Sequence, residues 1–138
     1  MIVSVDPGDS VGVALWSEQG AILENWKVDR GGFSYWLRHE KRPISRIIAE
    51  DFHLDHRAGK QTGSNVPAAL VLGGIEMYAA IHDIPITRQE NRILRITAMH
   101  ANVMLPKGHI PDDVAAFLHG FRYFIEAGVL AGEVQVVD

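Results

Sequence analysis

Acidic residues follow two of the apolar stretches that are typical of buried strands. Asp6 comes directly after residues 2–5 and precedes Pro7 and Gly8, and Glu50 comes directly after residues 47–49. If these two strands are parallel neighbours, their ends meet at one edge of a sheet and the two carboxylates lie side by side. Like charges so placed repel each other unless a cation sits between them. The pattern therefore predicts a metal site, although an Asp before Pro-Gly also suits a simple turn.

A third acid at the start of a late helix can close this site from the side. Asp112 and Asp113 are both in the right place, and the residue types leave both open. Carboxylate oxygens suit Mg²⁺, for which Mn²⁺ commonly substitutes. His109 lies three residues before Asp112 and could be a ligand, a proton carrier or a contact to phosphate. Alternatively, His109 simply precedes the helix and faces solvent.

Composition limits the class of protein. The chain has 138 residues, of which 47% are apolar and 22% charged, so we expect one globular domain over residues 1–138. It has no cysteine, which excludes disulfides and thiolate zinc sites, and His53, Asp55 and His56 alone do not supply a clear four-ligand zinc set. We see neither a leader-like amino terminus nor a membrane span, and expect a cytoplasmic protein.

The net charge of −4 weighs against a general nucleic-acid binder, because affinity for phosphates comes mainly from clustered Lys and Arg. Two divalent cations held by the carboxylates would offset that charge. The basic residues are also clustered in the sequence, in three groups: Arg38, Lys41, Arg42 and Arg46; Arg57 and Lys60; and Arg88, Arg92 and Arg95. Each group could equally be solvated surface.

Hydrophobic periodicity and turn residues predict an α/β protein. We expect strands at residues 2–5, 11–16, 21–28, 47–49 and 84–87, and helices at residues 33–41, 65–83, 91–104 and 112–126. A polar loop covers residues 53–64, Asn65 can cap the helix after it, and residues 134–137 form a last strand or a tail. The first three strands form an antiparallel meander, and helical crossovers add parallel strands. This mixed five-stranded sheet flanked by helices is the layout of the ribonuclease H-like fold.

Four stretches, in this order along the chain, resemble the RuvC-type Holliday junction resolvases: IVSVDPGDSVGVALW, IIAEDF, NVPAALVLGGIEMYAA and HIPDDVAAFLHG. The resemblance implies that Asp6, Glu50 and a His-x-x-Asp pair, matched by His109 and Asp112, are the catalytic residues. Asp6, Glu50 and Asp112 would be the metal ligands. Asp113 departs from the family pattern and makes the register ambiguous, but the spacing from His109 favours Asp112.

The resemblance also implies an activity and partners. It predicts a homodimeric endonuclease that cuts two strands of a four-way DNA junction symmetrically, using two Mg²⁺ ions per site and no small-molecule cofactor. Hydrolysis would leave a 5′ phosphate and a 3′ hydroxyl. The loop after Glu50 would contact the junction, with Phe52 or His53 stacking on bases and Arg57 and Lys60 contacting phosphates. The short chain suggests a phage or mobile-element version.

Rival functions share parts of this pattern. A ribonuclease H-fold nuclease acting on other branched DNA, flaps or RNA–DNA hybrids would use the same acids, so it is the main alternative. A non-catalytic DNA-binding relative would have lost an acid, and a phosphotransferase of the wider superfamily needs a second domain.

The helix expected at residues 65–83 is apolar on more than one face. A helix of this kind is usually buried on two sides. One side would pack on the sheet and the other on a twofold partner, as the resemblance also implies.

Overall fold

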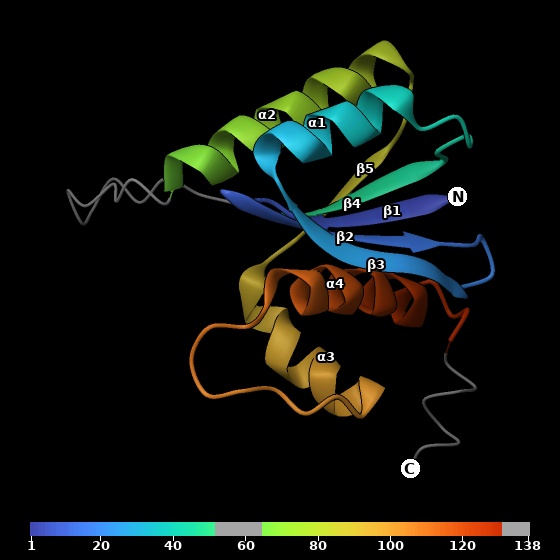
Figure 1. The fold of residues 1–138 in the computed structure, drawn as a ribbon. Helices are drawn as coiled ribbons and strands as arrows, with labels where there is room; N and C mark the ends of the chain where they lie inside the picture. Colours follow the sequence, from blue (N-terminus) through green and yellow to red (C-terminus); the bar gives the residue numbers. More distant parts are fainter. Residues whose placement is uncertain (52–64, 131–138) are drawn as a thin grey trace.

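The computed structural model describes residues 1–51 and 65–130, which form a five-stranded sheet between two helical layers (Figure 1). The strand order is β3-β2-β1-β4-β5. The strands are β1 (Ile2–Asp6), β2 (Ser10–Trp16), β3 (Ile22–Asp29), β4 (Arg46–Glu50) and β5 (Ile86–Gln89). The helices are α1 (Arg30–His39), α2 (Asn65–Ile81), α3 (Leu94–Ala101) and α4 (Asp112–Glu126), with a 3₁₀ turn η1 (Asn91–Ile93) before α3.

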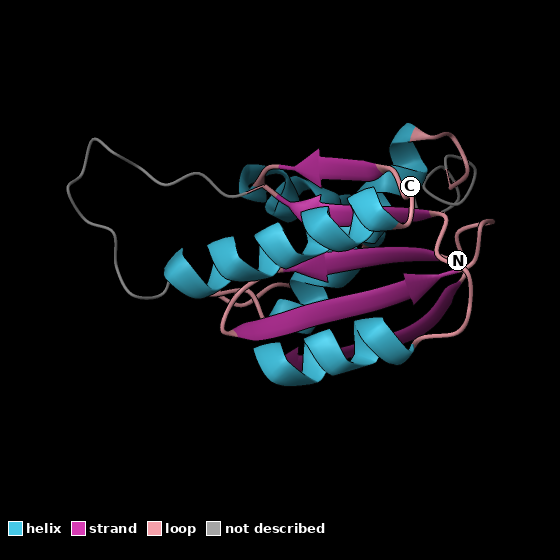
Figure 2. Ribbon diagram, turned by 90° about the horizontal axis from the view of Figure 1, so that it is seen from above, coloured by secondary structure: helices cyan, strands magenta, loops and turns pink. Residues whose placement is uncertain are grey.

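The sheet is mixed, as the sequence predicts. Strands β1, β2 and β3 form an antiparallel meander, whereas β4 pairs parallel to β1 and β5 pairs parallel to β4. Helices α1 and α2 cover one face, where they lie in front of the strands when seen from above (Figure 2). Helix α4 covers the other face, with α3 beyond it (Figure 1). The predicted ribonuclease H-like architecture is therefore confirmed.

Side-chain alternation along the strands sends each residue to one of the two helical layers. Val3, Val5 and Ile47 face α1 and α2, in a core that includes Phe33 and Ile75. The intervening residues face α4 instead. There, Ile2, Ala14, Trp16 and Ile48 pack with Phe124. By the same alternation, Asp6 and Glu50 lie on the α4 side of the sheet.

Helix α4 packs closely on the sheet because one of its residues is glycine. A Cβ at Gly120 would overlap the indole of Trp16. The Trp16 indole N–H donates to Ser4 Oγ at 2.9 Å, and Ser4 Oγ donates to the carbonyl of Ala116 at 2.6 Å. These bonds satisfy the buried polar atoms between β1, β2 and α4, and they set the height of the helix above the sheet.

Several element boundaries differ from the prediction, most of them by one or two residues. Helix α1 begins at Arg30 because Asp29 caps it, accepting a hydrogen bond from the Gly32 N–H at 2.6 Å. The two adjacent glycines therefore lie inside its first turn and do not break the pattern. Strand β5 begins and ends two residues later than expected.

The helix predicted at residues 91–104 is wrong in extent. It is divided into η1 and the shorter α3, which ends at Ala101. Asn102, with φ 56°, takes the left-handed conformation, and its N–H bonds to the carbonyls of Ala98 and Met99.

Some predictions concern residues outside the described part of the chain. These are the loop at residues 53–64 and the strand or tail at residues 134–137. Helix α2 begins at Asn65, the predicted cap, but the side chain of Asn65 is also outside the description. Among the residues described, no helix combines the length and the apolar character needed to cross a membrane.

Candidate active site

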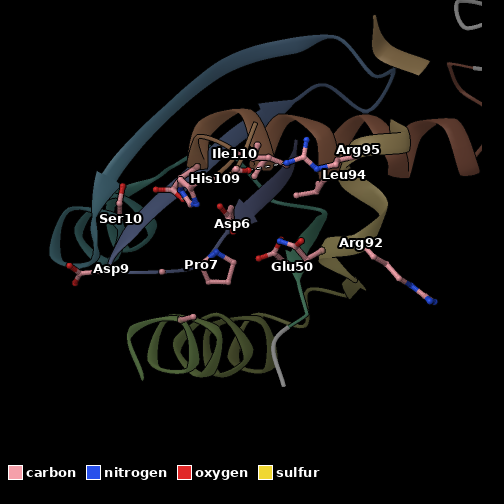
Figure 3. A pocket seen from close by; sticks show the side chains of 16 residues that line it. Asp6, Pro7, Asp9, Ser10, Glu50, Arg92, Leu94, Arg95, His109 and Ile110 are labelled. Atoms are coloured by element: carbon pink, nitrogen blue, oxygen red, sulfur yellow. Dashed lines mark hydrogen bonds and ion pairs between the residues drawn. The ribbon is translucent and has the colours of Figure 1, made fainter. Parts of the chain in front are cut away.

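Asp6 and Glu50 end neighbouring parallel strands and lie side by side. Val5 pairs with Ala49 across β1 and β4, so the next residue of each strand is one of the two acids. Pro7 and Gly8 then stop β1. Asp6 is 8% exposed, and the two side chains face the same space (Figure 3). The predicted adjacency of the two carboxylates is confirmed, because it depended only on β1 and β4 being parallel.

Helix α4 brings a third carboxylate to this edge. Gly12 lies opposite Asp6 in the β1–β2 pair, and a Cβ at Gly12 would overlap the backbone carbonyl of Asp112. The Asn25 amide also ties the helix start to the sheet, because Nδ2 donates to the carbonyls of Val13 and Asp113, each at 2.9 Å. The start of α4 is thus held against β2 at the level of Asp6.

A pocket of about 580 Å³ opens at this point. Asp6, Glu50, His109 and Asp112 all line it, whereas Asp113 is not among its lining residues. The His109 side chain is 82% exposed, and its Nε2 lies 3.6 Å from Asp112 Oδ1. The structure therefore brings the four residues expected to be catalytic to one pocket, and Asp113 does not line it.

Burial and mutual repulsion separate the proton affinities of the two strand-end acids. Burial of Asp6, with the nearby charges of Glu50 and Asp112, raises the pKa of its carboxyl from 3.8 to about 10. Burial acts on Glu50 in the same direction, but hydrogen bonds from His119, Asp6 and Asn91 outweigh it and lower the pKa of Glu50. With no cation between them, the site keeps a proton on Asp6 at neutral pH and leaves the charge on Glu50.

The residues that hold Glu50 were missed by the sequence reasoning. His119 Nε2 lies 3.1 Å from Glu50 Oε1, and Asn91 Nδ2 donates to the same oxygen at 2.9 Å. His119 is fully buried and its Nδ1 lies 2.8 Å from Gln89 Oε1. A signal was present, because His119 follows Asp112 by seven residues, two helical turns, and so lies on the same face of α4. The apolar residues around it masked that signal.

Two arginines that the sequence placed in a basic cluster also line the pocket. Arg95 donates to the carbonyls of Gly108 at 2.9 Å and Pro106 at 3.5 Å, and so braces the loop that carries His109. Arg92 points away from the carboxylates (Figure 3) and pairs with Glu90. The pocket therefore has acids at its base and a basic rim formed by Arg92 and Arg95.

The donor set fits a hard divalent cation in its chemistry. Asp6, Glu50 and Asp112 offer carboxylate oxygens, and the chain has no thiolate to favour a softer ion. As they are placed, no three His, Asp or Glu side chains of the described residues form a group that could hold a metal ion. A bound cation would have to draw these carboxylates together and displace the proton on Asp6.

The structure does not describe the predicted DNA contacts that follow β4. Phe52, His53, Arg57 and Lys60 lie outside the described residues. Asp51 Oδ1 accepts a hydrogen bond from Arg88 Nη1 at 3.2 Å, at the point where β4 leaves the sheet.

Comparison with known proteins shows which solved structures share this fold. No protein-family model and no curated protein matches the chain. Among solved structures, T. thermophilus RuvC in complex with a Holliday junction substrate matches with a TM-score of 0.62 and 15% sequence identity. The fold is that of RuvC. The match covers 93% of this chain and 96% of that chain. A second Thermus thermophilus RuvC structure matches over the same shares of both chains with a TM-score of 0.56 and 17% sequence identity. The RuvC-type fold predicted from the four sequence stretches is thus confirmed.

Proposed function

We propose that this protein is a metal-dependent DNA endonuclease that resolves four-way junctions by cutting two strands symmetrically. One observation carries the proposal: Asp6, Glu50, His109 and Asp112 line a single pocket at the edge of a sheet with the RuvC fold. The matched structure of RuvC holds a Holliday junction substrate, which supports branched DNA as the substrate class.

In the proposed site, Asp6, Glu50 and Asp112 hold two Mg²⁺ ions, for which Mn²⁺ can substitute. When bound, the ions would supply an activated water and stabilise the leaving 3′ oxygen. The chain's own residues orient the ligands and move the proton. Glu50 keeps its negative charge and its orientation through His119 and Asn91. His109, exposed at the rim beside Asp112, is placed to carry a proton to or from the phosphate.

The basic rim would hold the DNA backbone. Arg92 and Arg95 lie on the wall of the pocket, within one turn of each other. Positively charged side chains beside the acids would attract the phosphates that flank the cut and position the strand over the ions. Arg57 and Lys60 belong to the same proposal as contacts farther along the junction.

A twofold dimer would place two such sites on one junction. The outer face of α2 supports it, because Val66, Leu70, Met77 and Ile81 are each half or more exposed. An apolar groove of about 470 Å³ runs beside them, between α1 and α2. Exposed apolar residues along one helix are typical of a surface that packs on a partner. The sequence prediction that one side of this helix packs on the sheet holds for Val71 and Ile75.

The test is cleavage of matched substrates with Mg²⁺ present. We expect a mobile four-way junction to be cut in preference to a fork, a flap, an RNA–DNA hybrid and a linear duplex. The products should carry 5′ phosphates and be joined by ligase without further treatment. Preferred cutting of a flap or a hybrid would reject the resolvase and favour the broader nuclease of the same fold.

Variants then test the assignment of the acids. Glu50→Gln and Asp112→Asn should each abolish cutting but leave junction binding largely intact, since they remove a cation ligand and no phosphate contact. Asp113→Asn is the matched control, because Asp113 does not line the pocket. An active Asp112→Asn with an inactive Asp113→Asn would place the third ligand one residue later.

A further inference from the structure

His119 joins two buried polar side chains on neighbouring strands. It projects from α4 and is 0% exposed, between Glu50 at the end of β4 and Gln89 at the end of β5. Glu50 pairs with Gln89 across these strands, so both side chains meet the helix at one level. An apolar residue could have filled this place, since Leu118 and Phe124 of the same helix are also buried. The hydrogen bonds of the imidazole therefore explain why a histidine occupies this position.

The donors and acceptors around His119 define which nitrogen carries the proton. A neutral imidazole donates through one nitrogen and accepts through the other. An ionised Glu50 can only accept a hydrogen bond, so Nε2 of a neutral ring must donate to it, and Nδ1 must then accept. Gln89 can donate to Nδ1 only through its amide nitrogen. As drawn, Gln89 presents Oε1 to the ring, and its Nε2 is buried without a hydrogen-bond partner.

A rotation of the Gln89 amide by half a turn resolves both problems. Amide oxygen and nitrogen are assigned from the hydrogen-bond network. With the amide reversed, Gln89 Nε2 donates to His119 Nδ1, and the buried nitrogen is no longer unpartnered. The ring is then held in one tautomer, with its proton on Nε2 and directed at Glu50.

We propose that His119 is a positioning residue for Glu50. Its Nε2–H holds Glu50 Oε1 in place together with Asn91, so that the carboxylate presents Oε2 toward Asp6 and the cation proposed there. Gln89 selects the tautomer that makes this possible. The inference rests on the proposed metal site, and it deepens that site by naming what orients one of its ligands.

The position of His119 on α4 gives this role a structural basis. The same helix carries Asp112 at its start and His119 two turns later, so one rigid element sets two of the three carboxylates. Gly120, the next residue, lets the helix approach the sheet closely enough for the imidazole to reach β4 and β5. Hydrogen bonds to ligating carboxylates commonly change metal affinity or activity by about 10- to 100-fold.

Two amide substitutions separate the two hydrogen bonds of the ring. In His119→Gln, the side-chain nitrogen lies near the place of Nε2 and can still donate to Glu50. In His119→Asn, the shorter side chain reaches only the place of Nδ1 and can still pair with Gln89. The two variants are matched in polarity and differ in which partner they keep.

We expect the affinity for Mn²⁺, measured by calorimetry on the full chain, to separate them. His119→Gln should stay within about threefold of the wild type, whereas His119→Asn should lose roughly 10- to 100-fold. Denaturant unfolding of each variant reports any general loss of stability. Equal losses of Mn²⁺ affinity in both variants, or none in His119→Asn, would overturn the positioning role.

A spectroscopic measurement tests the tautomer without any variant having to be active. Nitrogen NMR of the imidazoles in the metal-free protein reports which ring nitrogen carries a proton, and the His119 signals are those missing from the His119→Gln spectrum. A proton on Nε2 with none on Nδ1 supports the inference, whereas a proton on Nδ1 or an unprotonated Nε2 overturns it.

Junction cleavage by the wild type is measured in parallel. Failure to cut any junction counts against the proposed function alone, because the NMR and Mn²⁺ results decide the role of His119 separately.

Discussion

Asp6→Asn should stabilise the metal-free protein while removing a residue proposed to be essential for cutting. In the folded state, burial and the charges of Glu50 and Asp112 raise the pKa of Asp6 from 3.8 to about 10. A raised acid pKa means that the folded protein holds a proton that the unfolded chain has lost. The free energy of unfolding therefore falls as the pH rises between these two values.

The size of the effect follows from the pKa values. At pH 7 the unfolded carboxyl is roughly three pH units above its pKa of 3.8, and each unit corresponds to about 1.36 kcal/mol. The buried Asp6 carboxyl thus lowers the free energy of unfolding at pH 7 by at most about 4 kcal/mol. Asparagine fills nearly the same volume without a charge, so Asp6→Asn should recover part of this amount, on the order of 1–4 kcal/mol.

The assay is urea unfolding of wild type and variant at pH 5, 7 and 9 with a chelator present. The stability difference should grow with pH, because only the wild type must protonate Asp6 on folding. Adding Mg²⁺ should narrow the difference, since a ligand at 100 times its dissociation constant adds about 2.7 kcal/mol to the protein that binds it. Asp9→Asn is the control, because the Asp9 side chain is 83% exposed and should change stability little.

Two results would refute this reasoning. One is an Asp6→Asn protein that is no more stable than the wild type at pH 7 in chelator. The other is a stability difference that does not change between pH 5 and pH 9, which would mean that Asp6 is ionised in the folded protein and is not repelled by its neighbours.

Further predictions concern the start of α4, the basic rim and the outer face of α2. Gly12→Ala should lower the free energy of unfolding by about 1–3 kcal/mol and reduce cutting, because the new methyl overlaps the backbone of α4. Gly31→Ala is the control, because a methyl there makes only ordinary contacts and should change neither quantity. Unfolding and cleavage assays measure both effects. Arg92→Ala should lower the slope of junction binding against salt by about one, measured by titration at several salt concentrations. Leu70→Glu should convert a dimer to a monomer in light scattering, whereas Ile96→Glu, exposed on α3, should leave a dimer intact. A monomeric wild type would reject the last prediction.

The sequence was sufficient for the parts of the fold that depend on local pattern. Apolar strands closed by turn residues predicted the meander and the edge at which Asp6 and Glu50 meet. Hydrophobic periodicity predicted α4 with its bounds at Asp112 and Glu126. Boundaries set by a single hydrogen bond were harder to predict from the sequence. The cap at Asp29, for example, begins α1 three residues before the predicted start.

The sequence by itself determined which acids stand at strand ends, because strand alternation and turn chemistry act between neighbours in the chain. The spacing from His109 favoured Asp112 over Asp113, but only the tertiary structure showed that Asp112 lines the pocket and that His119 contacts Glu50. The rotation of α4 about its axis brings Asp112 to the pocket. That rotation depends on contacts with distant strands: Gly12 and Asn25 contact the start of the helix, and Gly120 of the helix packs on Trp16. His119 lies among apolar residues in the sequence, and its function becomes visible only when packing places Glu50 and Gln89 on either side of its ring.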